Sequence, residues 1–306
     1  MGKIFDSIEI GNVLPMKYPL LMIDRAELIS EVEAVGIRNL TINELFFQGH
    51  FPSHPILPGV LQIEAMKQLA QLSITAAFSP AADEDIYIKC IEKVKFRKPN
   101  LPGDRMRITS ERLELTDREA IFACKTFNAS GLTCEAKITL AVRKRIRPME
   151  MPEDYNELDR SDAITLDIAG LMRFMPHRYP FLFCDYVASA EGSRVTSIKN
   201  LSGGEEFFQS CPNDFKIMTE ALLCEVMAQS GCAAVLARPE NEGKLAYFMS
   251  IDKAEFFHPV FPGDRLVIEF DLPPANSRFG KGSGIMSANG RKIVDMSLMF
   301  AIVAPE

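Results

Sequence analysis

The sequence predicts an α+β protein built from two copies of one domain. The first observation is an internal repeat that covers nearly the whole chain at an almost constant spacing. The second is one long helical segment in each copy, apolar on most of its faces and followed by strand-like alternating segments. One helix wrapped by an antiparallel sheet, present twice, accounts for both observations.

The repeat can be followed along the chain. The sequence LPMKYPLL at residues 14–21 returns as MPHRYPFL at residues 175–182, and Glu64 returns as Glu225, all at an offset of 161. Further on the offset becomes 160, as for the PGD sequences at 102–104 and 262–264. A constant offset with one single-residue slip indicates two tandem copies of one domain.

The repeat sets the expected domain boundaries. The first copy should span residues 1–147 and the second residues 166–306, and 306 residues suffice for two separate cores. The intervening residues 148–165 are polar, contain proline and show no apolar period, so we expect a linker there.

Each copy has the same order of expected elements. A short N-terminal segment leads to a strand, a loop and a helix of about five turns, at residues 59–78 and about 218–237. Three or four alternating strands follow, with hairpin turns at the sequences NASG (128–131) and SANG (287–290). Two such sheets side by side would form one platform with the helices near a pseudo-twofold axis.

Composition excludes several classes of function. The net charge of −7 argues against a nucleic-acid binder. Seven cysteines without CxxC pairs indicate neither a disulfide framework nor a zinc site, and we expect no metal or redox cofactor. The longest charge-free segment, residues 68–82, is shorter than the roughly 20 residues of a membrane span, so we expect a cytoplasmic protein without membrane contact.

The loop before the first helix carries the candidate chemistry. In GHFPSHPILPG (residues 49–59) three prolines stiffen the backbone around His50. The loop opens a helix whose first N–H groups are free to meet an acceptor. A rigid imidazole beside such N–H groups suits abstraction of a proton next to a carbonyl that becomes an enolate.

These residues carry a family resemblance. GHFPSHPILPGVLQIEAMKQ, with PMKYPLLMID upstream, resembles the FabZ branch of the (3R)-hydroxyacyl-ACP dehydratases, and the second half adds MPHRYPFLFCD and YFMSIDKAEFFHPVFPGD. The resemblance implies the hot-dog fold, here as a double hot dog. It also implies syn elimination of water from a 3-hydroxyacyl thioester delivered by acyl carrier protein, in fatty-acid or polyketide-type biosynthesis.

In that family a histidine from one copy works with a glutamate from the facing copy. The resemblance therefore implies that His50 removes the α-proton, that Glu225 protonates the leaving hydroxyl, and that the Gly59 N–H holds the thioester oxygen. We expect burial to raise the pKa of Glu225 so that it can act as an acid. The substrate tunnel would include Phe51, Pro58, Val60, Tyr87 and Tyr247.

The second copy departs from the pattern at the loop. SCPNDFKIMTE (residues 210–220) replaces GHFPSHPILPG, so Cys211 stands in place of the histidine. Cys211 should face Glu64 in a degenerate second site, which leaves one active site per chain. A nucleophilic Cys211 is disfavoured, because a neighbouring carboxylate would raise its pKa. The other three histidines are expected outside the chemistry: His54 and His258 at the surface, and His177 without a catalytic role because Met16 is its counterpart.

Charge is unequal between the halves. Residues 1–150 carry 20 basic and 19 acidic side chains, whereas residues 151–306 carry 14 and 22. Acyl carrier proteins are acidic, so the basic clusters of the first half are candidate docking residues, although a solvated strand face would also explain them. The candidates are Lys93, Lys95, Arg97, Lys98, Arg143 and Arg145.

Two other functions remain open. The chain could be a non-catalytic or weakly active partner in a dehydratase complex, or a hot-dog thioesterase. The intact first loop favours the enzyme over the partner. Members of the family often form trimers of dimers, so three fused chains could assemble into one oligomer.

Overall fold

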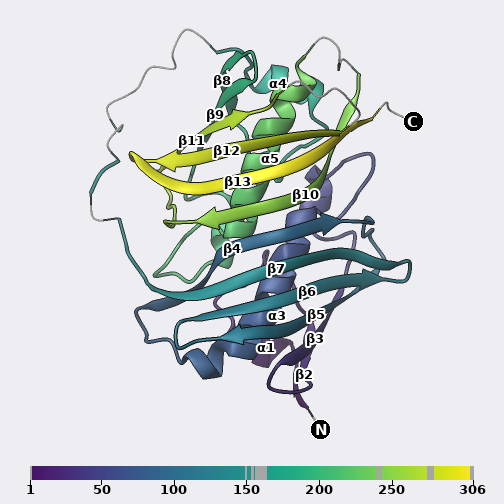
Figure 1. Ribbon diagram of the computed structural model, residues 1–306, viewed down its shortest axis with the longest axis vertical. Helices are drawn as coiled ribbons and strands as arrows, with labels where there is room; N and C mark the ends of the chain where they lie inside the picture. Colours follow the sequence, from purple (N-terminus) through teal and green to yellow (C-terminus); the bar gives the residue numbers. More distant parts are fainter. Residues whose placement is uncertain are drawn as a thin grey trace.

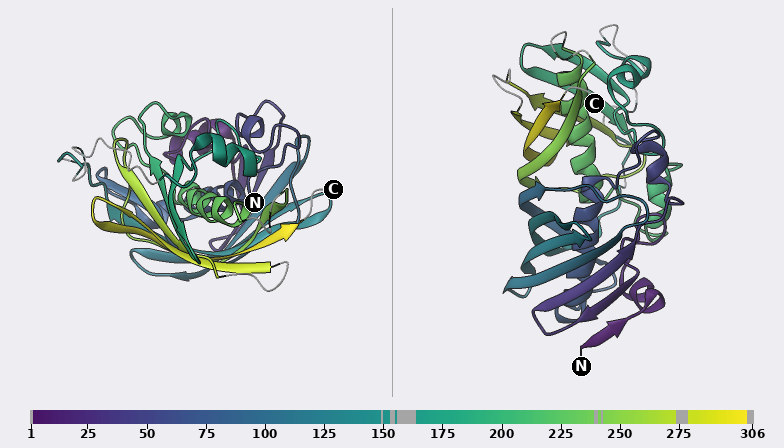
Figure 2. Two further views of the ribbon diagram at one scale, coloured as in Figure 1. Left: turned by 90° about the horizontal axis from the view of Figure 1, so that it is seen from above. Right: turned by 90° about the vertical axis from the view of Figure 1, so that its right-hand side faces the viewer.

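Two long helices lie end to end inside a curved antiparallel sheet. The computed structural model describes residues 2–148, 150–152, 155, 164–238, 241, 243–273 and 279–303. Helix α3 (Gly59–Phe78) has the predicted bounds, and α5 (Glu220–Leu236) starts two residues later and ends one residue earlier than predicted. Figures 1 and 2 show both helices on the concave side of the sheet. The predicted double hot-dog architecture is confirmed.

The described residues form one sheet of 13 strands, and every pairing in it is antiparallel. The first half contributes β1 (Lys3–Phe5), β2 (Arg25–Leu28), β3 (Glu33–Asn39), β4 (Glu84–Phe96), β5 (Arg105–Leu115), β6 (Glu119–Asn128) and β7 (Gly131–Lys144). The second half contributes β8 (Tyr186–Glu191), β9 (Arg194–Asn200), β10 (Leu245–Phe256), β11 (Arg265–Asp271), β12 (Phe279–Ala288) and β13 (Arg291–Val303).

The strand order shows the pseudo-twofold symmetry. The order is β1-β2-β3-β5-β6-β7-β4 in the first half, continued by β10-β13-β12-β11-β9-β8 in the second. Strands β4 and β10 pair at the centre, with Ile91 opposite Ala254, and so join the two sheets into one platform (Figure 1). The predicted turns connect β6 to β7 and β12 to β13.

Short helices lead into the functional loops. Helices α1 (Ser7–Val13) and α4 (Ile168–Phe174) open the two halves, and α2 (Phe46–Gly49) and the 3-10 helix η1 (Glu206–Ser210) precede the two loops. Of the predicted linker, residues 149, 153–154 and 156–163 lie outside the described residues. Within the described part of the chain, none of the helices has both the length and the apolar character that crossing a membrane requires.

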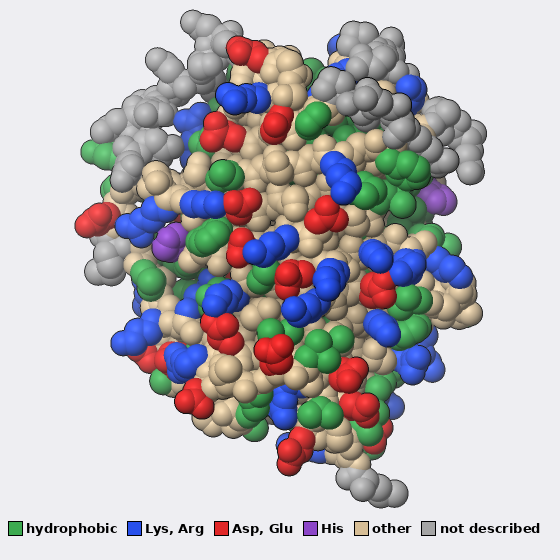
Figure 3. Space-filling view, in the orientation of Figure 1, with side chains coloured by type: hydrophobic (Ala, Val, Ile, Leu, Met, Phe, Trp, Pro, Cys, Tyr) green, Lys and Arg blue, Asp and Glu red, His purple; other side chains and the backbone are tan. Residues whose placement is uncertain are grey.

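The two central helices are buried on nearly all sides, which explains why their apolar residues exceed one stripe. A buried glutamine on each helix tethers the N-terminal segment of its own half. Gln68 accepts from the Met22 N–H (2.8 Å), and Gln229 accepts from the Phe183 N–H (2.8 Å). Figure 3 shows that the opposite, outer face of the sheet carries charges of both signs. The chemistry must therefore be sought on the concave side.

Candidate active site

His50 is held in one orientation by its own loop. Its Nδ1 lies 2.8 Å from the carbonyl oxygen of Ile56, and the Ile56 N–H donates back to the His50 carbonyl at 2.9 Å. A carbonyl oxygen can only accept, so Nδ1 carries the proton and Nε2 presents a lone pair. This is the tautomer that a proton-abstracting base requires.

A segment of the second copy docks on this loop. The Arg178 N–H donates to the Gly49 carbonyl at 2.9 Å, and a Cβ on Gly49 would lie 2.1 Å from the Arg178 carbonyl oxygen. Only glycine allows this approach. The contact places the buried His177 ring with its centroid 5.4 Å from that of His50.

Glu225 completes the cluster from helix α5. Its Oε1 accepts from Gln229 Nε2 at 2.8 Å and lies 3.6 Å from His177 Nε2. One potential ligand or proton-transfer atom from each of His50, His177 and Glu225 falls within 4.8 Å of the others. The structure therefore brings His50 and Glu225 together from different copies. Two imidazoles and a carboxylate are also donors that a transition metal accepts.

The electrostatics of the cluster differ in one respect from the sequence prediction. Burial, followed by the positive charge of His177, lowers the pKa of His50 to about 4, so His50 is neutral at physiological pH. Burial also raises the pKa of Glu225, but the hydrogen bond and charge of His177, with the charge of His50, outweigh burial and lower it below its ordinary value. The expectation of a raised Glu225 pKa is wrong, because it did not include His177.

The cluster lies in a cavity of about 380 Å³ with a largely apolar wall. Gly59, at the start of α3, lines it, and a Cβ there would lie 2.8 Å from the ring of Phe96, so the close approach of the ring requires glycine. Of the predicted tunnel residues, Phe51 and Tyr247 also line the cavity. Among the described residues its lining does not include Pro58, Val60 or Tyr87.

The second interface site keeps the scaffold without the histidines. Cys211 Sγ donates to the Ile217 carbonyl at 3.1 Å, which repeats the bond from His50 to Ile56 one copy later. Burial raises the pKa of Cys211, so the thiol stays protonated. Glu64 is fully buried and accepts from Gln68 at 2.8 Å, as Glu225 does from Gln229.

Charged side chains occupy the space around the second site. Glu220 stands where the first copy has Gly59, and Lys67, where the second copy has Ala228, lies 4.0 Å from Glu64 Oε1. Arg143 Nη2 lies 3.1 Å from Asp85 Oδ2 and 3.3 Å from Glu220 Oε1. Arg143 therefore forms two buried ion pairs and does not present its charge to a carrier protein. This corrects its assignment as a docking residue.

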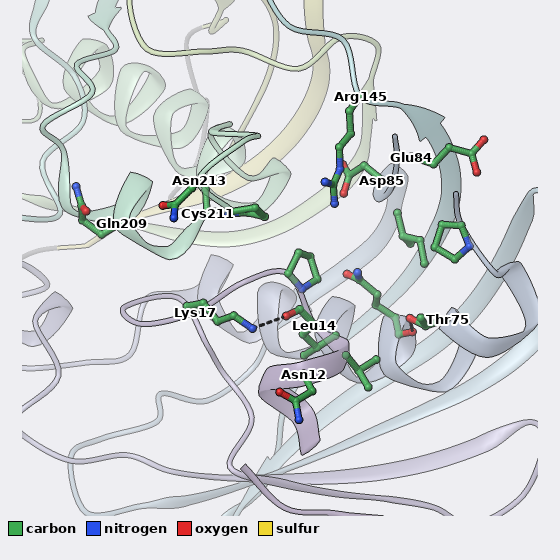
Figure 4. A pocket seen from close by; sticks show the side chains of 16 residues that line it. Asn12, Leu14, Lys17, Thr75, Glu84, Asp85, Arg145, Gln209, Cys211 and Asn213 are labelled. Atoms are coloured by element: carbon green, nitrogen blue, oxygen red, sulfur yellow. Dashed lines mark hydrogen bonds between the residues drawn. The ribbon is translucent and has the colours of Figure 1, made fainter. Parts of the chain in front are cut away.

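A separate polar hollow of about 510 Å³ opens beside this site (Figure 4). Figure 4 shows Cys211, Lys17, Asp85 and Arg145 around it. Arg145 also lies 3.4 Å from Asp214, so it too belongs to the second site rather than to the mouth of the His50 cavity. Tyr87 lies on the same side, with its ring centroid 4.2 Å from the Arg143 guanidinium.

Two of the remaining basic candidates, Arg97 and Lys98, are exposed and line the His50 cavity. The other two, Lys93 and Lys95, are exposed on β4 and are not among the residues that line it. His54 is exposed at the same cavity, and His258 is exposed at the end of β10, as predicted.

His177 is the residue that the sequence prediction missed. Because its counterpart is Met16, the sequence argued against a catalytic role for His177. Met16, however, lies against the loop of the second copy, in which Cys211 replaces the histidine. Ser210, which precedes Cys211, contacts the Met16 sulfur at 3.6 Å. The informative signal was therefore the joint replacement of His50 and His177 by Cys211 and Met16 across the interface.

The fold and the site define the class: a double hot-dog protein with a histidine and a glutamate paired across its domain interface. A family model described as the FabA-like domain matches residues 14–136 and again residues 175–298. The chain therefore belongs to the FabA-like family, with two tandem domains.

Known proteins of similar sequence agree with this assignment. The chain is 41% identical over 138 residues to the 3-hydroxyacyl-[acyl-carrier-protein] dehydratase FabZ of Halalkalibacterium halodurans, covering 45% of this chain and 99% of the relative. It is 42% identical over 150 residues to FabZ of Geobacter metallireducens, covering 48% and 100%. Among solved structures, the dehydratase domain from the CurJ module of the curacin polyketide synthase matches 93% of this chain and 98% of its own, with a TM-score of 0.58 and 16% identity.

Proposed function

We propose that the chain dehydrates a (3R)-3-hydroxyacyl thioester on acyl carrier protein to the trans-2-enoyl thioester, in fatty-acid or polyketide-type biosynthesis. One site per chain, at the interface of the two copies, performs the reaction. The observation that carries the proposal is the pairing of the oriented His50 of one copy with the buried Glu225 of the other in a largely apolar cavity. The dehydratase activity named for the FabZ relatives supports it.

His50 starts the reaction. Its Nε2 takes the α-proton, and the electron pair of that C–H bond passes into the thioester to form an enolate. Gly59 is the first residue of α3, so its N–H has no partner within the helix and can donate to the enolate oxygen. One donor of this kind is worth about 3–4 kcal/mol of barrier in other enzymes.

Glu225 and His177 finish the reaction as a pair. The electron pair of the enolate forms the 2,3 double bond while the C3–O bond breaks, and the leaving hydroxyl takes a proton and departs as water. Because the hydrogen bond and charge of His177 lower the pKa of Glu225 despite its burial, we assign the donation of this proton to the two groups together. Transfer through Glu225 Oε1, 3.6 Å from His177 Nε2, delivers that proton to the hydroxyl.

The carrier protein docks beside the His50 cavity. Arg97 and Lys98 are exposed in its lining and Lys95 is exposed two residues earlier on β4, and their counterparts in the second copy are Phe257, His258 and Glu255. A basic rim that accompanies only the complete site is what an acidic carrier would select.

The intact His50–Glu225 pair disfavours the non-catalytic alternative, and the protonated thiol of Cys211 gives no support to a thioesterase. We also propose that the first copy spans residues 1–147 and the second residues 166–306. Strand β7 of the first half ends at Lys144, and Leu166 forms a β-bridge with Val187 of the second half. Cytoplasmic location, assembly into trimers and independence from cofactors stay predictions.

The test compares Glu225→Gln with Glu64→Gln. Both carboxylates are buried and each accepts from a glutamine four residues later, so Glu64→Gln is a matched control. Dehydration of a 3-hydroxyacyl-ACP should fall about 10²–10⁴-fold only in Glu225→Gln. Loss in Glu64→Gln alone would mean that the site pairs the halves differently. An inactive wild type across acyl chain lengths would support the non-catalytic partner.

A further inference from the structure

Gln62 is a buried polar side chain in the wall of the His50 cavity that the proposed mechanism does not use. Gln62 lies on α3 three residues after Gly59, so it projects from the same face of the helix about 4.5 Å further along the axis. It lines the cavity and is only 3% exposed. Its neighbours in the wall include Phe96, Phe248 and Leu298. Burying a carboxamide in such apolar surroundings costs free energy unless its N–H and C=O groups form hydrogen bonds.

Among the residues that the structure describes, only one end of the Gln62 carboxamide has protein partners. Its Oε1 lies 2.7 Å from Thr126 Oγ1 and 2.9 Å from Thr133 Oγ1, and these two hydroxyls lie 2.8 Å from each other. Both threonines are fully buried, on the neighbouring strands β6 and β7. Within the described part of the chain no group accepts from Gln62 Nε2. The oxygen is thus turned to the sheet, which leaves the two N–H groups to the cavity.

The second copy shows that the fold does not need this polar set. The counterparts of Gln62, Thr126 and Thr133 at the repeat offsets are all buried and apolar: Leu223 (2% exposed), Met286 (0%) and Ile293 (2%). The strand registers agree, since Thr126 pairs with Cys134 and Met286 with Val294. All three positions are therefore polar in the half that contributes the complete loop, and apolar in the half that does not.

We propose that Gln62 recognises an oxygen atom on the acyl chain of the substrate. Its Nε2 donates to a hydroxyl, ether or carbonyl oxygen a few carbons beyond the β-carbon, because Gly59 holds the thioester one helical turn earlier. The substrate class is thus an oxygenated 3-hydroxyacyl thioester rather than a plain hydrocarbon chain. A hydrocarbon chain in the cavity would displace water from Nε2 and leave it without an acceptor. This inference rests on the proposed dehydratase function.

The test uses four acyl chains of equal length on the same carrier protein. They are 3-hydroxyoctanoyl and three analogues in which an ether oxygen replaces C5, C6 or C7; an ether cannot cyclise onto the thioester. The wild type is compared by kcat/KM with Gln62→Leu, which introduces the residue found at this position in the second copy. For the wild type, one ether analogue should be preferred over the all-carbon chain. Gln62→Leu should reduce that preference about tenfold while it dehydrates the all-carbon chain at least as fast.

A triple variant guards against loss of folding, because Gln62→Leu leaves two hydroxyls without their acceptor. Gln62→Leu/Thr126→Met/Thr133→Ile copies the apolar set of the second half and should show the same change of preference. If the wild type dehydrates the all-carbon chain best and the variants slow all four substrates equally, Gln62 has a structural role only. If the wild type dehydrates none of the four, the proposed function fails, and this inference fails with it.

Discussion

The two interface sites share a scaffold and a buried glutamate, and they differ in the other groups to which we assign the chemistry. In both, a loop side chain bonds an isoleucine carbonyl six residues later, and a buried glutamate accepts from a glutamine on its own helix. His50, His177 and Gly59 of one site correspond to Cys211, Met16 and Glu220 of the other. The shared bonds therefore belong to the common fold, and the proposed chemistry needs the differing residues in addition to the shared glutamate.

The differences also show how charged side chains fill the second site. A base without a proton donor, or a donor without an oxyanion partner, gives little catalysis, so these groups are useful only together. The second site instead holds ion pairs in its buried space: Lys67 with Glu64, and Arg143 with Glu220 and Asp85. The first site remains open because its counterparts of Lys67 and Glu220 are Ala228 and Gly59.

Removal of Arg143 should give the largest change in stability. Arg143→Met leaves Glu220 and Asp85 buried without their cation, which should cost about 3–5 kcal/mol in the free energy of unfolding. Burial raises the pKa of Glu220 even with Arg143 present, and without it the folded-state pKa should rise further. Since the folded state then binds the proton more readily than the unfolded state, the loss should be smaller at pH 5 than at pH 8.

Urea unfolding at both pH values measures this effect. Arg97→Met is the matched control, because Arg97 pairs with Glu135 on the surface and should change stability by less than about 1 kcal/mol. An equally small loss for Arg143→Met would show that the second site does not depend on its charges.

Replacement of His177 by methionine, its counterpart in the second site, should have the next largest effect. His177→Met should lower kcat about 10²-fold at pH 8. Burial then raises the pKa of the unassisted Glu225, so residual activity should fall toward high pH as Glu225 loses its proton. Loss of the His177 charge should also raise the pKa of His50 from about 4, which moves the acidic limb of the profile to higher pH.

The measurement is kcat/KM for dehydration between pH 4 and pH 9. Met16→His introduces the same side chain at the second site and should leave the profile unchanged. A wild-type profile in His177→Met would remove His177 from the mechanism and leave Glu225 as the sole proton donor.

Charge reversal at the cavity rim should have the smallest effect. Arg97→Glu with Lys98→Glu should raise KM for the acyl carrier substrate about tenfold at low salt, with a weaker effect at high salt and little change in kcat. Phe257→Glu with His258→Glu changes the corresponding rim of the second half and should not alter KM. Equal effects of both pairs would mean that the carrier responds to the total charge and not to this rim.

The sequence by itself determined the fold and one half of the site. Two tandem copies, the exact span of the first long helix and the hairpin turns follow from repeat spacing and apolar periodicity, which act over short stretches of chain. His50 and Gly59 could be predicted for the same reason: the proline-rich loop and the helix start that position them are continuous in sequence. The partnership with Glu225 followed from the family resemblance.

Only the tertiary structure decided the rest, because it depends on which segments meet across the interface. His177 enters the site through the contact of Arg178 with Gly49, more than a hundred residues away in the chain, and its charge reverses the expected shift of the Glu225 pKa. Arg143 looked like a surface cation until the fold placed it against Glu220. The free N–H groups of Gln62 likewise appear only when two strands turn its oxygen away from the cavity.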